Sequence, residues 1–159
     1  MTIGKAISTS LAVAVILAFS ITAMTQAAVQ EHTLEGAWNV TIAFQDPALP
    51  KCAPAGAVVT AVSPGSGTLI AESCYASEGA GYGAWIRTAH NQFAITFLGN
   101  SFGPTGTVVS TYKVRASVSL GPTANSFAGP FKTEAFDLAG NSLGTATGRV
   151  SGVRIVAKP

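Results

Sequence analysis

Charged side chains are scarce in this chain of 159 residues, and those present are scattered along it. Nine Lys and Arg nearly balance seven Asp and Glu, together 10% of the sequence, and no run of one sign occurs. Proteins that bind nucleic acids or anionic membranes by charge carry clustered Lys and Arg. The sequence therefore predicts no nucleic-acid partner and no charged membrane surface as a partner.

The sequence also lacks the common motifs for catalysis and metal binding. No cluster of His, Cys and Asp has metal-ligand spacing, and His32 and His90 lie far apart in the chain. No serine sits in a nucleophile-elbow motif, and the glycines mark turns rather than a phosphate-binding loop before a helix. We therefore predict no metal site and no cofactor, and the sequence identifies no catalytic residue.

Only one stretch is long and continuously apolar, and it lies near the start of the chain. Leu11–Phe19 follows Lys5 and precedes the small residues of Thr25–Ala27. This order is typical of a secretory signal peptide, and the apolar run is short for a membrane span. We expect a signal peptide at residues 1–27 and one domain at residues 28–159 without a membrane span, secreted or periplasmic. An uncleaved membrane anchor is the alternative.

Cysteine is nearly absent, because Cys52 and Cys74 are the only two. In an exported chain, two cysteines are typical of one disulfide. In the chain-entropy model such a bridge stabilises the fold by about 3 kcal/mol. We expect a disulfide between Cys52 and Cys74, and two free thiols are the alternative.

Helical periodicity is missing from the expected mature chain. No segment there keeps apolar residues at helical spacing over three turns, whereas alternation of apolar and polar residues recurs throughout. Gly, Ser, Thr, Ala and Val dominate, which favours strands and turns. The alternation predicts strands at residues 38–44, 57–62, 68–75, 82–88, 92–98, 107–120, 126–136 and 142–156.

Eight short strands joined by turns favour an all-β fold, an eight-stranded antiparallel up-and-down β-barrel, with a sandwich as the alternative. A closed barrel has no exposed strand edges, and eight strands enclose an interior that side chains can fill or that can hold one small ligand. In this order Cys52 and Cys74 fall at the same end. Residues 46–56 form the longest expected connection, so we expect that end to be the mouth, with this segment as a lid.

Trp38 begins the first predicted strand, and Arg154 lies late in the last one. Closure makes these strands neighbours, so the guanidinium can lie over the indole in a favourable cation–π contact. We therefore expect Trp38 and Arg154 to have a structural role at the closed end of the barrel.

The tripeptide Gly36-Ala37-Trp38 with a late Arg154 resembles the calycin pattern shared by lipocalins and avidins. The wider run GAW, GAWIRT, KVR, SFAGPF, FDLAGN and GRVSGVRI is similar to small exported bacterial lipocalin-like proteins, most without known function. That similarity covers nearly all of the expected mature chain. It implies a barrel braced by Trp38 and Arg154. The chain lacks the Thr-Asp-Tyr motif and C-terminal helix usual in lipocalins, and avidin's biotin contacts have no counterparts in it.

Trp85 and Arg87 share one face of the fourth predicted strand. If that face points inward, Trp85 lies nearer the mouth and Arg87 two residues deeper, where a buried guanidinium needs a partner and can hold a ligand carboxylate. The opposite phase would bury Tyr82, Ala84 and Ile86. We expect the inward phase, with a structural Arg87 favoured over a ligand clamp.

Other aromatic residues fall on inward phases of their strands. The predicted ligand-binding set is Trp85, Arg87, Tyr112, Phe97 and Phe44. Aromatic residues at a period of two are usually packed core, but small residues such as Ala116 and Ala135 leave room for a cavity among them. An apolar interior with one or two polar groups is typical of small-molecule sites.

Three functions fit this pattern. The favoured hypothesis is an exported barrel that binds a small apolar molecule, without enzymatic activity. The second is a cofactor-free barrel cyclase or isomerase, resembling allene oxide cyclases and spirotetronate cyclases, with Glu72, Tyr75, Arg87 and Tyr112 as the groups to test. The third is a barrel with a protein partner, resembling exported inhibitors of bacterial metalloproteases, with residues 28–36 as the inserting arm.

Overall fold

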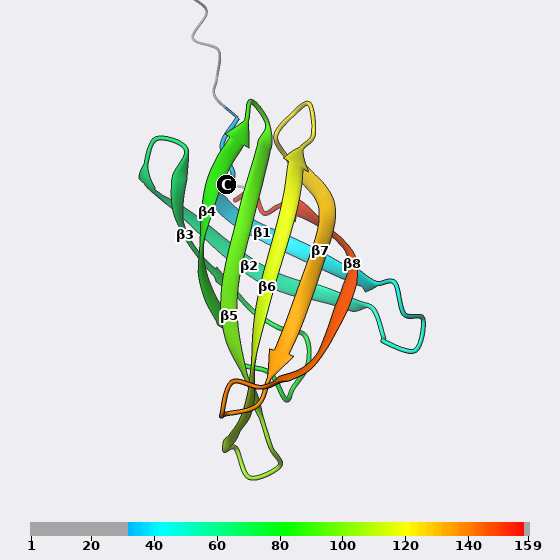
Figure 1. Cartoon of the computed structure of the whole chain (residues 1–159). Helices are drawn as coiled ribbons and strands as arrows, with labels where there is room; N and C mark the ends of the chain where they lie inside the picture. Colours follow the sequence, from blue (N-terminus) through cyan, green and yellow to red (C-terminus); the bar gives the residue numbers. More distant parts are fainter. Residues whose placement is uncertain (1–31, 158–159) are drawn as a thin grey trace, which may run out of the picture. The chain divides into compact units, whose positions relative to one another are not determined.

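The computed structural model describes residues 32–157, and it shows a closed antiparallel barrel. Each strand pairs with its neighbours in sequence, and the last strand pairs with the first (Figure 1). The strands are β1 (Gly36–Phe44), β2 (Cys52–Ser63), β3 (Ser66–Ala71), β4 (Gly81–Ala89), β5 (Gln92–Phe102), β6 (Val108–Leu120), β7 (Ser126–Phe136) and β8 (Ser142–Arg154).

The predicted all-β, eight-stranded up-and-down barrel is therefore confirmed. The predicted signal peptide at residues 1–27 lies outside the described residues. No helix in the described part of the chain has the length and apolar character needed to cross a membrane.

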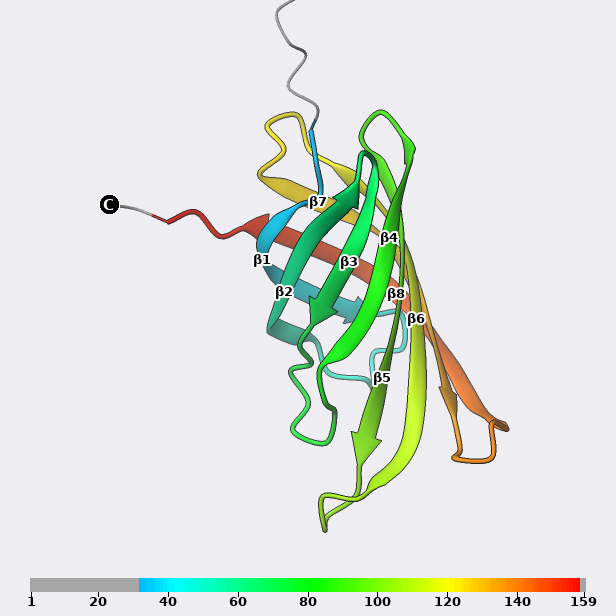
Figure 2. The same cartoon turned by 90° about the vertical axis from the view of Figure 1, so that its left-hand side faces the viewer.

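The connections fall at two opposite ends of the barrel. Turns at residues 64–65, 90–91 and 121–125 share one end, which we name the closed end, and loops 45–51, 72–80, 103–107 and 137–141 share the other, which we name the open end. In Figure 2 the closed-end turns lie towards the top, whereas the hairpin between β5 and β6 points down.

Several strand boundaries differ from the sequence-based prediction, and two of these differences change the loops at the open end. β2 begins at Cys52, because its first residues pair with β1 across a bulge between Val40 and Ile42. β3 ends at Ala71, so Cys74 lies in the loop after the strand. The expectation that β1 and β2 are joined by the longest connection is therefore wrong, because the β3–β4 loop, residues 72–80, is longer. Both loops lie at the open end, as the placement of the two cysteines predicted.

Interior aromatic rings lie directly opposite glycines on the neighbouring strand. An added side-chain carbon at Gly67 would come within 2.6 Å of the Trp85 indole nitrogen, and one at Gly99 would overlap the Tyr112 ring. Each ring thus occupies the space that a glycine leaves on the adjacent strand, which packs the wall and helps to set the register. The pairs are Trp85 with Gly67, Phe97 with Gly83, Tyr112 with Gly99, Phe131 with Gly148, and Phe127 with Gly152.

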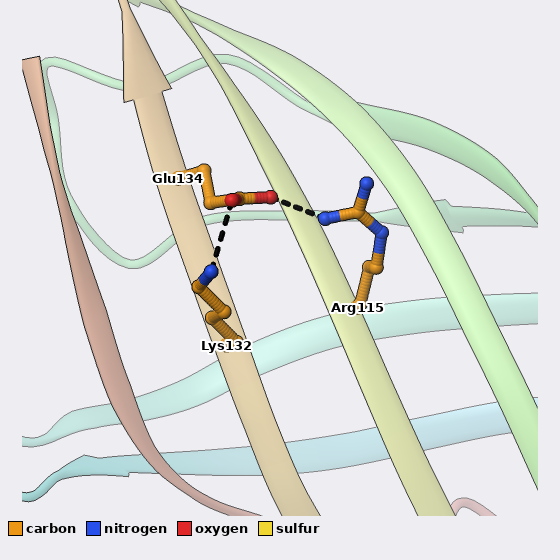
Figure 3. Close-up of polar contacts among 3 residues, drawn as sticks. All are labelled: Arg115, Lys132 and Glu134. Carbon is orange, nitrogen blue, oxygen red and sulfur yellow. Dashed lines mark hydrogen bonds and ion pairs between the residues drawn. The ribbon is translucent and has the colours of Figure 1, made fainter. Parts of the chain in front are cut away.

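The outer wall differs from one side of the barrel to the other. On β6 and β7, the Glu134 carboxylate is paired with Arg115 and with Lys132, whose ammonium lies 3.0 Å away (Figure 3). Lys113 is the cross-strand neighbour of Glu134, but the carboxylate is paired with Arg115 and Lys132. On β2 to β5 the exposed side is uncharged and carries Val58, Ile70, Tyr82, Ile86 and Leu98.

Candidate functional site

The interior holds a cavity of about 470 Å³ that extends from Leu34 and Phe127 near the closed end to the loops of the open end. Its wall is mainly apolar, with Val40, Val114 and Val150 among the residues that line it. Loop residues Leu49 and Pro50 from the β1–β2 connection border it at the open end. This volume lies within the range of small-molecule sites, about 300–1,000 Å³.

Three of the aromatic residues predicted to bind a ligand line this cavity. Phe44, Phe97 and Tyr112 all face it, from β1, β5 and β6. The Phe97 and Tyr112 rings meet edge to face with centroids 6.5 Å apart, and Phe44 meets Phe131 in the same way at 5.3 Å. Edge-to-face pairs hold rings in fixed orientations, so one wall of the cavity is preset before any ligand enters.

The other two residues predicted to bind a ligand, Trp85 and Arg87, lie at the closed end and not in the wall of the cavity. Trp85 points inward, as predicted, and is 2% exposed, but neither it nor Arg87 is among the residues that line the cavity. The expectation that Trp85 lies nearer the mouth is wrong, because its indole N–H donates to the Thr60 carbonyl, 3.1 Å away, close to the turn between β2 and β3. Its ring meets Phe93 edge to face, so it packs the closed end.

Arg87 fastens two segments of the main chain at the closed end. Its guanidinium donates to the carbonyl of His90 in the β4–β5 turn and to the carbonyl of His32, at 3.0 and 3.1 Å. The guanidinium carbon also lies 5.4 Å from the centre of the Phe93 ring. The guanidinium therefore has the hydrogen-bonding partners that its burial requires, and they include main-chain carbonyl groups of the protein itself.

Arg154 also fastens main-chain segments through their carbonyl groups, on the opposite side of the closed end. Its guanidinium donates to the carbonyls of Thr33, Glu35 and Ala124, and its central carbon lies 4.2 Å from the centre of the Trp38 ring. The predicted cation–π contact is therefore present. Burial lowers the pKa of Arg154, and the Glu35 carboxylate partly opposes that shift.

Residues 32–35 form a plug across the closed end. Leu34 is 1% exposed and also contributes to the floor of the cavity. Its carbonyl accepts a hydrogen bond of 2.9 Å from the Trp38 indole, which is itself fully buried against Phe127. Two arginines and a tryptophan thus hold this short segment in place, so the cavity is blocked at this end.

The polar groups of the cavity gather at the open end, mainly on the β3–β4 loop. Glu72, Ser73, Tyr75 and Glu78 all contribute to the lining there. The Ser73 hydroxyl donates to the Glu78 carboxylate at 2.6 Å, and the Tyr75 hydroxyl donates to the Pro50 carbonyl at 2.8 Å. The second bond joins the β3–β4 loop to the β1–β2 loop, so both loops that border the cavity are tied together.

Tyr112 connects the aromatic wall to this polar rim. Its hydroxyl donates to the Gly79 carbonyl at 3.0 Å. Burial, with a smaller contribution from the Glu78 carboxylate, raises the pKa of Tyr112 to about 12. The same two causes raise the pKa of Tyr75 above its usual value. Both phenols therefore stay protonated at neutral pH, which makes them hydrogen-bonding groups rather than bases.

The predicted disulfide between Cys52 and Cys74 is present, and it anchors this loop to the start of β2. Cys52 is fully buried. The bridge spans 22 positions in sequence and closes the segment that contains β2, β3 and the start of the β3–β4 loop.

Glu78, Ser73 and Leu34 line the cavity but were not expected from the sequence. A signal for the first two was present, because residues 72–80 carry two glutamates and a tyrosine between two apolar strands. Among the described residues, no group of three or more His, Cys, Asp or Glu is placed to hold a metal ion. Of the groups proposed for catalysis, Glu72, Tyr75 and Tyr112 line the cavity and Arg87 does not.

Comparison with known proteins leaves the family open. No family model matches the chain, and no curated protein matches it either. A structure described as EF1p2_mFAP2b bound to DFHBI is 15% identical, with a TM-score of 0.49, over 77% of this chain and 94% of that one. A redesigned β-barrel, b11L5F_LGL, is 14% identical, with a TM-score of 0.48, over 78% of this chain and 92% of that one.

Proposed function

We propose that this barrel binds a small, largely apolar molecule in the cavity at its open end. The observation that carries the proposal is an apolar cavity of about 470 Å³ inside a barrel that is blocked at its other end. Ring pairs and the hydrogen bond between the two loops hold the walls of this cavity, so the protein would lose little conformational entropy on binding. Preorganisation of this kind favours affinity.

Binding is best tested with a neutral dye whose fluorescence rises in apolar surroundings, such as N-phenyl-naphthylamine. Ala135 lines the cavity on β7, whereas Ala128 on the same strand faces solvent. Ala135→Phe should abolish dye binding because the new ring fills the cavity, and Ala128→Phe should leave it unchanged. Equal binding by both variants, or no binding by the unmodified protein, would contradict the proposal.

The reporter has to be the dye rather than tryptophan emission. Trp38 and Trp85 are both buried at the closed end, and neither lines the cavity. Their fluorescence therefore has no direct contact with a bound molecule.

We also propose that the protein is exported, with cleavage after Ala27 and a periplasmic or extracellular location. The disulfide supports the proposal, because such bridges persist in oxidising compartments. Intact-mass measurement on protein from the exported fraction should give a chain starting at Ala28 with no thiol open to labelling. A full-length chain, or two titratable thiols in the folded protein, would contradict it.

Membership of the lipocalin-like calycins remains a proposal. The stacked Trp38 and Arg154 at the junction of β1 and β8 support it. The alternative of a protease-inhibiting arm at residues 28–36 gains no support from the described part of that segment, since residues 32–35 are fastened onto the barrel by Arg87, Arg154 and Trp38.

A further inference from the structure

The charges that border the cavity are all of one sign. Glu72 and Glu78 line it, and no Lys, Arg or His is found among the described residues that do so. At the open end, Lys51 follows the lining residue Pro50, but it is exposed and does not itself line the cavity. Arg87, the group expected to receive a ligand carboxylate, is engaged at the closed end.

The hydrogen-bonding capacity left at this rim is mostly that of acceptors. The hydroxyl protons of Tyr75 and Tyr112 are already donated to the main-chain carbonyls of Pro50 and Gly79. The proton of Ser73 is donated to Glu78. A phenol or alcohol whose O–H group already donates a hydrogen bond can still accept one, and so can the carboxylate oxygens. Ser101 and Thr133 also line the cavity, but a hydroxyl serves equally as donor or acceptor and sets no preference of charge.

We propose that the cavity selects apolar ligands whose polar head is a hydrogen-bond donor, above all a protonated amine, and discriminates against carboxylates. The apolar body would occupy the part of the cavity lined by Val114, Phe97 and Leu34, and the head would lie beside Glu72 and Glu78. This inference rests on the ligand-binding function proposed above and names the chemical class that this site takes.

The preference arises from negative charge placed beside a mainly apolar cavity. An ammonium group a few ångströms from a carboxylate is attracted, and a ligand carboxylate at the same place is repelled, with an energy that depends strongly on the local dielectric. Glu72 is exposed and Glu78 is half-buried, so solvent screens part of the effect. We expect the amine to bind about tenfold more tightly than the matched carboxylate at low ionic strength, with the ratio shrinking as salt is added.

The experiment is displacement of bound N-phenyl-naphthylamine by three matched ligands: decylamine, decanol and decanoate. The expected order of affinity is the amine first, then the alcohol, then the carboxylate. In the Glu72→Gln/Glu78→Gln protein, the ratio of amine to carboxylate affinity should fall about tenfold, since only the charge is removed. Glu134→Gln removes the same charge on the outer wall, and Lys51→Gln removes the neighbouring positive charge; both should preserve the order.

Each outcome decides something different. If the dye binds and decanoate displaces it with the same affinity as decylamine, the proposed preference for amines is wrong, but the proposed apolar binding site is retained. If the order is unchanged in the double variant, the two carboxylates are not its cause. If neither the dye nor decanol binds, the ligand-binding function itself fails. Because Glu78 accepts a bond from Ser73, the double variant can lose its loop structure; Glu72→Gln alone then provides the test, with a smaller change in the same direction.

Discussion

The two halves of the barrel interior carry similar aromatic rings, but these rings have different neighbours. At the closed end Trp38 and Trp85 are 0% and 2% exposed, and each indole donates to a main-chain carbonyl while its ring packs against a phenylalanine. At the open end Phe97 and Tyr112 also meet edge to face, yet each has the cavity on one side. A ring enclosed on all sides supports the fold, whereas a ring with one free side offers a surface to a ligand.

The polar groups divide in the same way. Both arginines of the interior lie at the closed end, where they hold residues 32–35 by carbonyl groups. Both glutamates that line the cavity, Glu72 and Glu78, lie at the open end. Stability and binding are thus assigned to opposite ends of one barrel, and variants at the two ends should separate them.

The largest expected effect is the loss of a ring at the closed end. Trp38→Ala should lower the free energy of unfolding by roughly 3–5 kcal/mol, because it removes a fully buried indole and leaves a void. Phe97→Ala should cost clearly less, because one side of that ring already faces the cavity. Chemical denaturation of both variants measures the difference, and equal losses would remove the distinction between the two ends.

The arginines should have an intermediate effect on stability and none on binding. Arg154→Met and Arg87→Met each remove charge-assisted hydrogen bonds to main-chain carbonyls, with an expected loss of about 1–3 kcal/mol in the free energy of unfolding. Arg154 stacks on Trp38, so a double-mutant cycle between them should show non-additive losses. A coupling energy near zero would contradict the brace, and weaker dye binding by Arg87→Met would place Arg87 in the ligand site after all.

The smallest expected effect is a pH dependence at the open end. The pKa of Tyr112 is raised from 10.0 to about 12 in the folded protein. The folded state therefore holds this proton where the unfolded state has lost it, so stability falls as the pH rises between about 10 and 12. Unfolding measured across that window should show this decline, and Tyr112→Phe should reduce it. An identical decline in the variant would show that Tyr112 is not responsible.

The fold was largely predictable because its determinants are local. Alternation fixes which residues point inward, and Gly- and Pro-rich turns fix where each strand ends, so the barrel, the buried phase of Trp85 and the contact between Trp38 and Arg154 could all be expected. The disulfide was expected because the chain has only two cysteines and an apparent export signal, and the up-and-down order places Cys52 and Cys74 at one end. The ring-over-glycine pairs could not be expected, because they depend on the register between strands.

The site was less predictable because depth and partners are set by tertiary structure. The position of Trp85 along the barrel depends on strand tilt and on where β2 and β3 turn, neither of which alternation specifies. Arg87 bonds to His32, a residue 55 positions away, through a carbonyl group that every residue possesses. Glu78 lies in a loop without periodicity, so its place at the rim is evident only in the folded chain.

The central claim, that the open half holds the ligand while the closed half holds the fold, is tested most directly by locating a bound neutral molecule. Nuclear Overhauser contacts between decanol and the labelled protein would report which side chains it touches. We predict contacts to Val114, Phe97 and Tyr112, and none to the indoles of Trp38 and Trp85. Contacts to either indole, or only to the exposed Tyr82 and Leu98 of the outer wall, would contradict the account.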